Sequence, residues 1–276
     1  MLTRSSAHVH TTYCDGKSTA AQRAKSAHDH GFVSLGFSTH AYQPFDPDYC
    51  MKQDQEMAYR REITDLKAQY QGKMAIYLGI ERDYYGAISP DPYDYFIGST
   101  HYFLKSEGFY GVDGAPESTQ AYVERYCNGD GLKFVRDYFD QLRRYILDIR
   151  PPIIGHFDLV RKNNTVLHLF DEEDPQYQKM ALECLSALRE TDAILEVNTG
   201  AIARGYMTAP YPAPFLLKAW HELKGRIMLN SDCHNAAFIA CHYDEAEEMM
   251  RACGYTTAWR LGQSNLFEEY SLLETR

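Results

Sequence analysis

Two short segments of this chain place pairs of metal-binding side chains two residues apart. His8 and His10 form the first pair, and Asp232 and His234 form the second. On an extended segment, residues i and i+2 point to the same side, so each pair can hold one cation between its side chains. A single pair is weak evidence, because 11 histidines in 276 residues produce about half a His-x-His pair by chance. A metal site is therefore expected only if similar side chains stand at comparable positions elsewhere.

Side chains of the same kinds follow nearly every expected strand. Short apolar, β-branched or aromatic runs predict strands at about 5–10, 33–39, 74–81, 94–100, 153–157, 193–198 and 226–231, with a weaker one near 255–258. Helical spacing predicts helices at about 18–30, 52–71, 118–128, 131–149, 175–191, 213–224 and 243–253. Alternating strands and helices imply a parallel sheet, and seven such units imply a TIM-like (β/α)7 barrel. We expect this α/β fold to form one domain over 1–276.

In such a barrel the chemistry lies at the carboxyl ends of the strands. The imidazoles and carboxylates expected at that end are His8, His10, Asp15, His40, Glu81, His101, His156, Asp232 and His234. Without cations, their lone pairs and negative charges would stay unsatisfied. The sequence therefore predicts a metal centre at this mouth, and these ligand types accept Zn, Fe or Mn. The sixth strand ends at Glu196 to Asn198, to which no ligand role is assigned, and Arg204 follows in its loop.

The composition is that of a globular protein able to bury a sizeable core. Hydrophobic residues make up 45% and charged residues 24%, which excludes collagen, coiled coil and wholesale disorder. The net charge of −10 disfavours nucleic acid as a partner. The sequence has no long uncharged apolar run and no basic-then-apolar start, and its seven cysteines are scattered, so we expect a cytoplasmic protein without a membrane segment. We expect a monomer or a small homo-oligomer.

Six motifs together resemble the polymerase and histidinol phosphatase (PHP) superfamily. They are His8-Val-His10-Thr11 with Asp15-Gly16, Thr39-His40, Gly79-Ile80-Glu81, Ser99-Thr100-His101, Gly155-His156-Phe157-Asp158 and Ser231-Asp232-Cys233-His234. The resemblance runs from Ala7 to His234 and is greatest to the stand-alone histidinol-phosphate phosphatases. It implies a distorted seven-stranded barrel with a centre of three divalent metal ions.

The resemblance also implies how the ligands are shared. One ion would be held by His8, His10, Glu81 and Asp232, and a second by Glu81, His101 and His156, with Glu81 bridging the two. A third ion would take Asp15, His40 and His234. The phosphate-binding arginines of the family would match Arg161 and Arg204.

These ligands suit phosphoester hydrolysis. Three divalent ions outweigh the three carboxylates and attract a phosphate dianion, and the expected chemistry is in-line attack on phosphorus by a hydroxide that bridges two ions. Arg161 and Arg204 would hold the non-bridging oxygens, and Asp158 or a water would protonate the leaving group. Tyr42 is a candidate for lining the substrate pocket, and the loop at 105–118 is either a lid or a plain surface connection.

The expected function is hydrolysis of L-histidinol phosphate in histidine biosynthesis. The alternatives are a phosphatase for a nucleotide or sugar phosphate, a metal-dependent amidohydrolase, and a non-catalytic PHP domain. Three segments depart from many relatives: Thr39 replaces a glutamate, 41–44 differs after the second strand, and 12–15 differs after the first. These departures bear on the identity of the substrate more than on metal binding.

Overall fold

The computed structural model describes residues 4–86, 89 and 91–273. Seven strands lie side by side in the order of the chain, and every neighbouring pair is parallel. They are β1 (Ser5–Ser6), β2 (Ser34–Phe37), β3 (Ala75–Asp83), β4 (Tyr95–Ser99), β7 (Ile153–Ile154), β8 (Ile194–Asn198) and β9 (Ile227–Asn230). The expected parallel α/β fold is therefore confirmed, with each strand within a few residues of its predicted position.

The two edges of this sheet meet just beyond β1 and β9. Val9 and Cys233 form a parallel bridge, in which the His10 amide donates to the Cys233 carbonyl at 3.0 Å and the Cys233 amide donates to the His8 carbonyl at 3.4 Å. We call this contact the barrel seam. Because the seam consists of one bridge and β1 and β7 have only two residues each, the barrel is distorted from a regular cylinder.

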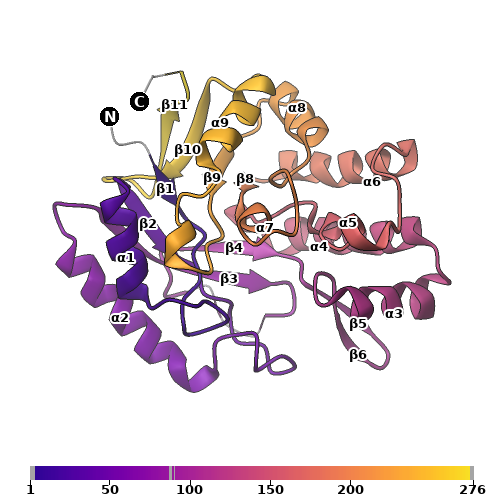
Figure 1. Cartoon of the computed structure of the whole chain (residues 1–276), viewed down its shortest axis with the longest axis horizontal. Helices are drawn as coiled ribbons and strands as arrows, with labels where there is room; N and C mark the ends of the chain where they lie inside the picture. Colours follow the sequence, from indigo (N-terminus) through magenta and orange to yellow (C-terminus); the bar gives the residue numbers. More distant parts are fainter. Residues whose placement is uncertain (1–3, 87–88, 90, 274–276) are drawn as a thin grey trace.

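Helices cover the outside of the barrel, as Figure 1 shows. The longer ones are α1 (Ala20–Asp29), α2 (Glu56–Gln69), α3 (Pro116–Cys127), α4 (Gly131–Ile149), α6 (Pro175–Ser186), α8 (Pro214–Glu222) and α9 (Tyr243–Ala252). The short helices α5 (Asn164–Leu167) and α7 (Gly200–Ala203) lie in loops that follow β7 and β8. Within the described part of the chain, no helix combines the length and the apolar character needed to cross a membrane.

Two features differ from the expected pattern. The stretch expected as a loop at 105–118 begins with an antiparallel hairpin, β5 (Tyr102–Lys105) and β6 (Gly108–Gly111), because Tyr102 and Phe103 are buried and Phe103 stacks on Tyr122 of α3. The weak final strand is β10 (Thr257–Leu261), and it pairs with an unexpected antiparallel partner, β11 (Phe267–Ser271). Neither hairpin interrupts the order of the seven parallel strands.

The amino-terminal end of the barrel interior is filled by apolar side chains. The cluster consists of Ala7, Tyr95, Ile97, Ile153, Ile194, Met228 and Leu261. Tyr95, Ile153 and Ile194 are the first residues of β4, β7 and β8, so this floor lies at the opposite end of the strands from the predicted metal centre. The Tyr95 hydroxyl is satisfied by donating to the Ala7 carbonyl at 2.5 Å. We call this apolar cluster the floor of the barrel. The floor fills the amino end of the barrel, and the polar residues of the strands lie at the carboxyl end.

Candidate metal centre

All nine predicted ligands lie together at the carboxyl ends of the strands. Seven are buried, and only Asp15 and His234 retain part of their exposure. The fold brings together side chains from both ends of the sequence because β1 and β9 meet at the barrel seam. Four overlapping groups of these residues have ligand atoms within 4.8 Å of one another: His10, Asp15, His40 and His234; His8, Glu81 and His156; His8, His10 and Asp232; and His40, Glu81 and His101.

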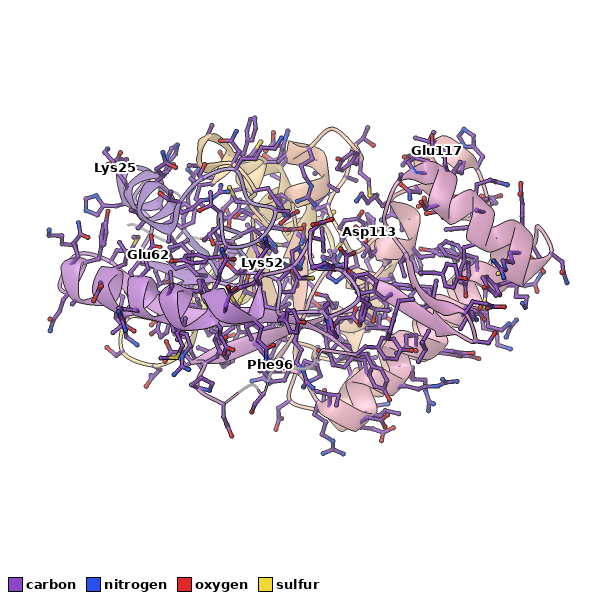
Figure 2. All side chains as sticks on the ribbon, turned by 90° about the horizontal axis from the view of Figure 1, so that it is seen from below. Lys25, Lys52, Glu62, Phe96, Asp113 and Glu117 are labelled. Carbon is purple, nitrogen blue, oxygen red and sulfur yellow. The ribbon has the colours of Figure 1, made fainter. Side chains whose placement is uncertain are left out.

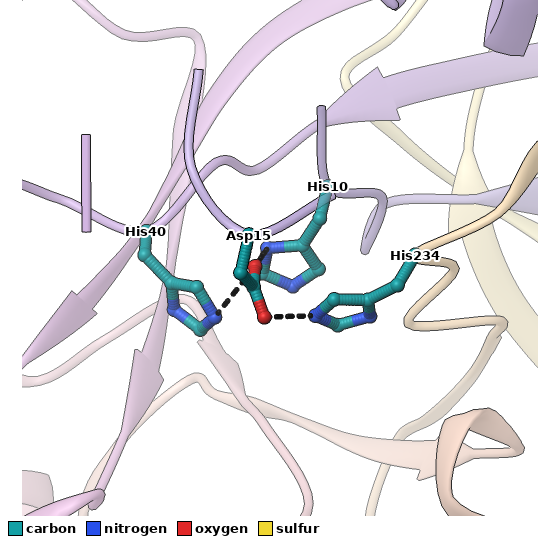
Figure 3. A group of neighbouring side chains, drawn as sticks. All are labelled: His10, Asp15, His40 and His234. Carbon is teal, nitrogen blue, oxygen red and sulfur yellow. Dashed lines mark ion pairs between the residues drawn. The ribbon is translucent and has the colours of Figure 1, made fainter. Parts of the chain in front are cut away.

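The first of these groups surrounds Asp15, as Figure 3 shows. Asp15 Oδ2 lies 3.1 Å from His234 Nε2, while Oδ1 lies 3.8 Å from His40 Nε2 and 3.9 Å from His10 Nδ1. The two longer distances exceed those of hydrogen bonds. The four side chains therefore point toward a common space, and only the pair of Asp15 and His234 lies within hydrogen-bond distance.

Glu81 lies at the centre of the remaining ligands. Its Oε2 faces His40 Nδ1 at 2.8 Å and His8 Nε2 at 3.2 Å. Its Oε1 faces His156 Nε2 at 3.1 Å and His101 Nε2 at 3.5 Å. Because the two oxygens face different imidazoles, this carboxylate has the geometry of a bridge between two cations.

Asp232 joins the two ligand pairs at the seam. Its Oδ1 lies 3.2 Å from His10 Nε2 and 3.5 Å from His234 Nδ1. Its Oδ2 accepts a hydrogen bond from Arg204 Nη2 at 3.2 Å. The backbone of Asp232 is left-handed, with φ of 44°, at the point where the chain leaves β9.

Several buried polar atoms of this cluster have no hydrogen-bond partner among the described residues. They include Asp15 Oδ1 and His40 Nε2. In addition, His8 Nε2 and His10 Nε2 face each other at 3.1 Å, so two imidazole nitrogens compete for one proton. Buried polar atoms of this kind require partners, and a divalent cation would satisfy lone pairs on nitrogen and oxygen together. The residues present therefore fit a divalent metal centre.

The charges of the cluster favour cations as well. Burial acts to lower the pKa of His8, yet the carboxylates of Glu196 and Glu81, with Asp232, raise it well above its ordinary value. Burial lowers the pKa of His101 to about 4, which leaves that imidazole neutral and its lone pair available near neutral pH. The carboxyl end of the barrel thus combines several carboxylates with a neutral imidazole, that of His101, which can donate a lone pair to a cation.

Glu196 is a buried carboxylate beside the cluster to which the sequence argument assigned no role. Its Oε1 accepts a hydrogen bond from His8 Nδ1 at 2.7 Å, and its Oε2 accepts one from the His156 amide at 2.7 Å. The side-chain amides of Asn230 and Asn198 donate to the same two oxygens, each at 2.9 Å. Because an ionised carboxylate only accepts hydrogen bonds, His8 carries a proton on Nδ1, and its Nε2 faces Glu81 and His10 in the cluster. The available signal was an acidic residue inside a buried strand, where burial requires partners.

Of the two predicted arginines, only Arg204 reaches the cavity above the ligands. This cavity has a volume of about 480 Å³, and its walls include Arg204, Lys162, Asp113 and Tyr49. Arg161 is not among the lining residues, because its Nε donates to Glu172 at 2.6 Å and its Nη1 donates to Asp158 at 3.1 Å. The neighbouring Lys162, which the sequence argument passed over, faces the cavity instead.

The structure also places Asp158 and Tyr42 away from this cavity. Asp158 is fully buried and accepts hydrogen bonds from Arg161 and from the Ala213 amide at 2.8 Å. Both of these bonds go to Oδ2, and Oδ1 has no hydrogen-bond partner among the described residues. Tyr42 lines a separate hollow with Glu56 and Arg60. The geometry argues against Asp158 as the proton donor because its side chain is fully buried and does not line the cavity, and it argues against Tyr42 as a wall of the substrate pocket.

The segment that follows the β5–β6 hairpin forms one wall of the cavity. Gly111 and 113–116 line it, and Lys162 Nζ donates to the Asp113 carboxylate at 2.9 Å and to its carbonyl at 2.7 Å. Figure 2 shows Asp113 in the middle of the molecule, between α2 and α3. On the opposite side, the Tyr49 ring packs on His40 with centroids 4.2 Å apart. Tyr49, Asp113 and Lys162 are among the wall residues that the sequence did not single out.

Comparisons with known proteins agree with this arrangement. The sequence model of the PHP domain matches residues 6–200, a range that ends before Asp232 and His234. A Deinococcus radiodurans protein named "Probable histidinol-phosphatase" is 30% identical over 262 residues, which cover 91% of this chain and 94% of that protein. The "Histidinol-phosphatase" of Bacillus subtilis is 27% identical over 260 residues, which cover 86% of this chain and 96% of that protein.

A solved structure shares the fold. It is histidinol phosphate phosphatase from Lactococcus lactis subsp. lactis Il1403, complexed with Zn, L-histidinol and phosphate. It matches with a TM-score of 0.72 at 19% identity, over 94% of this chain and 97% of that one. At this identity the likeness concerns the fold, and it agrees with the distorted barrel described above.

Proposed function

Because this chain belongs to the PHP domain family, we propose that it is a metal-dependent phosphomonoesterase that hydrolyses L-histidinol phosphate to L-histidinol and phosphate in histidine biosynthesis. The observation that carries the reaction class is the convergence of nine ligand side chains beside a cavity that also contains Arg204 and Lys162. The proposed substrate is supported by the names of the relatives in Deinococcus radiodurans and Bacillus subtilis. We further propose that the protein acts in the cytoplasm, as a monomer or small homo-oligomer without nucleic acid.

We propose that three divalent ions, chosen from Zn, Fe and Mn, occupy the centre. The assignments are His8, His10, Glu81 and Asp232 for one ion, Glu81, His101 and His156 for a second, and Asp15, His40 and His234 for a third. Support for this division comes from Glu81, whose Oε2 faces His8 and whose Oε1 faces His156, and from the group around Asp15. His8, His10 and His40 each belong to two groups, so the division rests on the family pattern at these three positions.

The protein groups at the mouth prepare it for a phosphate dianion. Bound divalent ions supply the positive charge that attracts the phosphate, and they lower the pKa of water toward about 7. Arg204 contacts Asp232 and lines the cavity, which places a guanidinium beside the expected position of the non-bridging oxygens. Glu196 keeps His8 in the tautomer that a ligand requires. Since Asp158 is enclosed, a residue of the cavity wall or a water must protonate the leaving group.

Chelation followed by reconstitution tests the reaction class. Exhaustive removal of metal should abolish hydrolysis of both an aryl phosphate and histidinol phosphate, and Mn²⁺ or Zn²⁺ should restore it. Full activity in the metal-free protein would refute the proposal. A control phosphatase that needs no metal, carried through the same treatment, excludes damage caused by the chelator.

The substrate requires a separate experiment. The departures at 12–15, Thr39 and 41–44 favour keeping a second candidate, a phosphatase for another small phosphomonoester such as a nucleotide or sugar phosphate. Comparing kcat/KM across histidinol phosphate and a panel of these esters separates the two candidates. A preference for any other ester by tenfold or more would overturn the histidinol phosphate assignment and leave the reaction class standing.

A further inference from the structure

Arg23 is a fully buried arginine behind the metal centre. Its exposed fraction is 0%, and it lies on the inner face of α1, where the other buried residues are Ala20, Ala24 and Ala27. These small neighbours leave room for the long side chain to extend from the helix toward the barrel. Arginine is rarely buried completely unless it is paired, so its contacts should explain its presence.

The guanidinium group contacts both sides of the barrel seam. Arg23 Nε donates to the carbonyl of His10 at 3.0 Å, and Nη1 donates to the sulfur of Cys233 at 2.8 Å. The Cys233 thiol in turn donates to the Asn235 carbonyl at 2.9 Å. One planar group therefore links the segment after β1 to the segment after β9, in addition to the backbone bridge between Val9 and Cys233.

These contacts lie directly beside the ligand pairs of the seam. His10 is a proposed ligand, and Cys233 stands between Asp232 and His234. The distance of 3.2 Å between His10 Nε2 and Asp232 Oδ1 depends on how far apart the two segments lie. Because an arginine presents several donors in a fixed plane, it can set that separation more rigidly than a single hydrogen bond can.

The charge of Arg23 is not explained by an ion pair. Among residues 4–86, 89 and 91–273, no carboxylate forms an ion pair with it, and its Nη2 has no hydrogen-bond partner. Stability alone would favour an apolar residue at such a position, since an unpaired buried charge is costly. The site that benefits is the adjacent centre, where Asp15, Glu81 and Asp232 gather negative charge.

We propose that Arg23 is a positioning residue for the metal centre: it fixes the barrel seam so that the His8–His10 pair and the Asp232–His234 pair can bind cations jointly. The inference rests on the proposed metal centre and does not depend on which phosphate ester is the substrate. Among the described residues, the hydrogen bonds of Arg23 go to the backbone of His10 and to Cys233, so it acts through these two groups.

Metal binding by the variant R23M tests the proposal. Methionine is long, unbranched and compatible with a helix, but it donates no hydrogen bonds. We expect divalent metal to bind the seam ligands about tenfold to a hundredfold more weakly, as for other groups that orient ligands. Elemental analysis after dialysis at a buffered Zn²⁺ concentration measures the stoichiometry, and the visible spectrum of the Co²⁺-loaded protein reports the geometry of the ligands.

K25M is the matched control on the same helix. Lys25 is exposed and pairs only with Asp29, and Figure 2 shows it on the outside of the molecule. K25M should keep the wild-type metal content and Co²⁺ spectrum. R23K retains the charge but has no second arm for Cys233, so it should bind metal with an affinity between those of the wild type and R23M, and it serves as the test protein if R23M does not fold.

The possible outcomes distinguish a failure of the proposed role of Arg23 from a failure of the proposed metal centre. A normal metal content and Co²⁺ spectrum in R23M, or in R23K when R23M does not fold, would overturn the role of Arg23 even if the melting temperature falls. A wild-type protein that binds no divalent ion at all would instead overturn the proposed metal centre. Loss of metal in R23M with an unaltered fold by circular dichroism, and normal binding in K25M, supports the inference.

Discussion

The two ends of the barrel interior are built from the same strands but satisfy their side chains in opposite ways. At the amino end, Tyr95, Ile97, Ile153 and Ile194 pack on one another and are at most 3% exposed. At the carboxyl end, imidazoles and carboxylates converge, and buried atoms such as Asp15 Oδ1 have no partner among the described residues. Burial alone stabilises the floor, whereas the mouth is complete only with cations. Glu196 accepts hydrogen bonds from two residues of the carboxyl end, from His8 Nδ1 and from the His156 amide.

The largest effect on metal binding and activity should follow from a change at Glu81, which lies at the centre of the ligands. Glu81→Gln removes the charge from the carboxylate that faces five imidazoles. We expect loss of two ions at once and a fall in kcat/KM of more than about a hundredfold, exceeding the effect usual for an orienting residue. Elemental analysis and phosphatase assays measure these quantities, and full metal occupancy in the variant would contradict the bridging role.

A smaller effect on the same metal centre is expected from a change at Glu196. Glu196→Gln replaces one of two acceptor oxygens with an amide donor, so the hydrogen bonds from His8 Nδ1 and from the His156 amide cannot both persist. We expect metal affinity to fall about tenfold to a hundredfold. Competition with a metal-binding dye measures it, and an unchanged affinity would show that His8 does not need this partner.

A change in the floor should separate stability from metal binding. Ile97→Ala removes buried methyl groups from a residue that is 0% exposed, and we expect unfolding to be easier by about 2–5 kcal/mol. The metal content of the folded protein should stay at the wild-type level. Denaturant titration and elemental analysis check the two halves of this expectation. Loss of an ion from the folded variant would mean that floor and mouth are coupled.

The smallest effect concerns the wall of the cavity. Lys162 lines the cavity and Tyr42 does not, so Lys162→Met should raise KM for a phosphate ester about tenfold, as expected for a charged hydrogen bond of about 1.4 kcal/mol, while Tyr42→Phe should change it by less than about twofold. Steady-state kinetics on the two variants measures both KM values. A larger effect at Tyr42 would restore the interpretation drawn from the sequence.

The sequence by itself was enough to predict the parallel α/β barrel and to select the nine residues that the structure gathers. Both follow from local regularities: strands and helices leave periodic patterns, and residues two apart on a strand share a side. The spacing of His8 with His10 and of Asp232 with His234 therefore predicts both pairs from the sequence alone. That these residues bind metal remains a proposal, which the experiments above address.

Only the tertiary structure decided which neighbouring side chains join them. Arg161 and Lys162 are adjacent in sequence, yet Asp158 and Glu172 hold the first while the second faces the cavity. Glu196 and Arg23 contact residues far away in the chain. In loops and across a seam, the direction of a side chain is set by the partners it meets in the folded chain rather than by backbone periodicity, so local sequence patterns do not encode it.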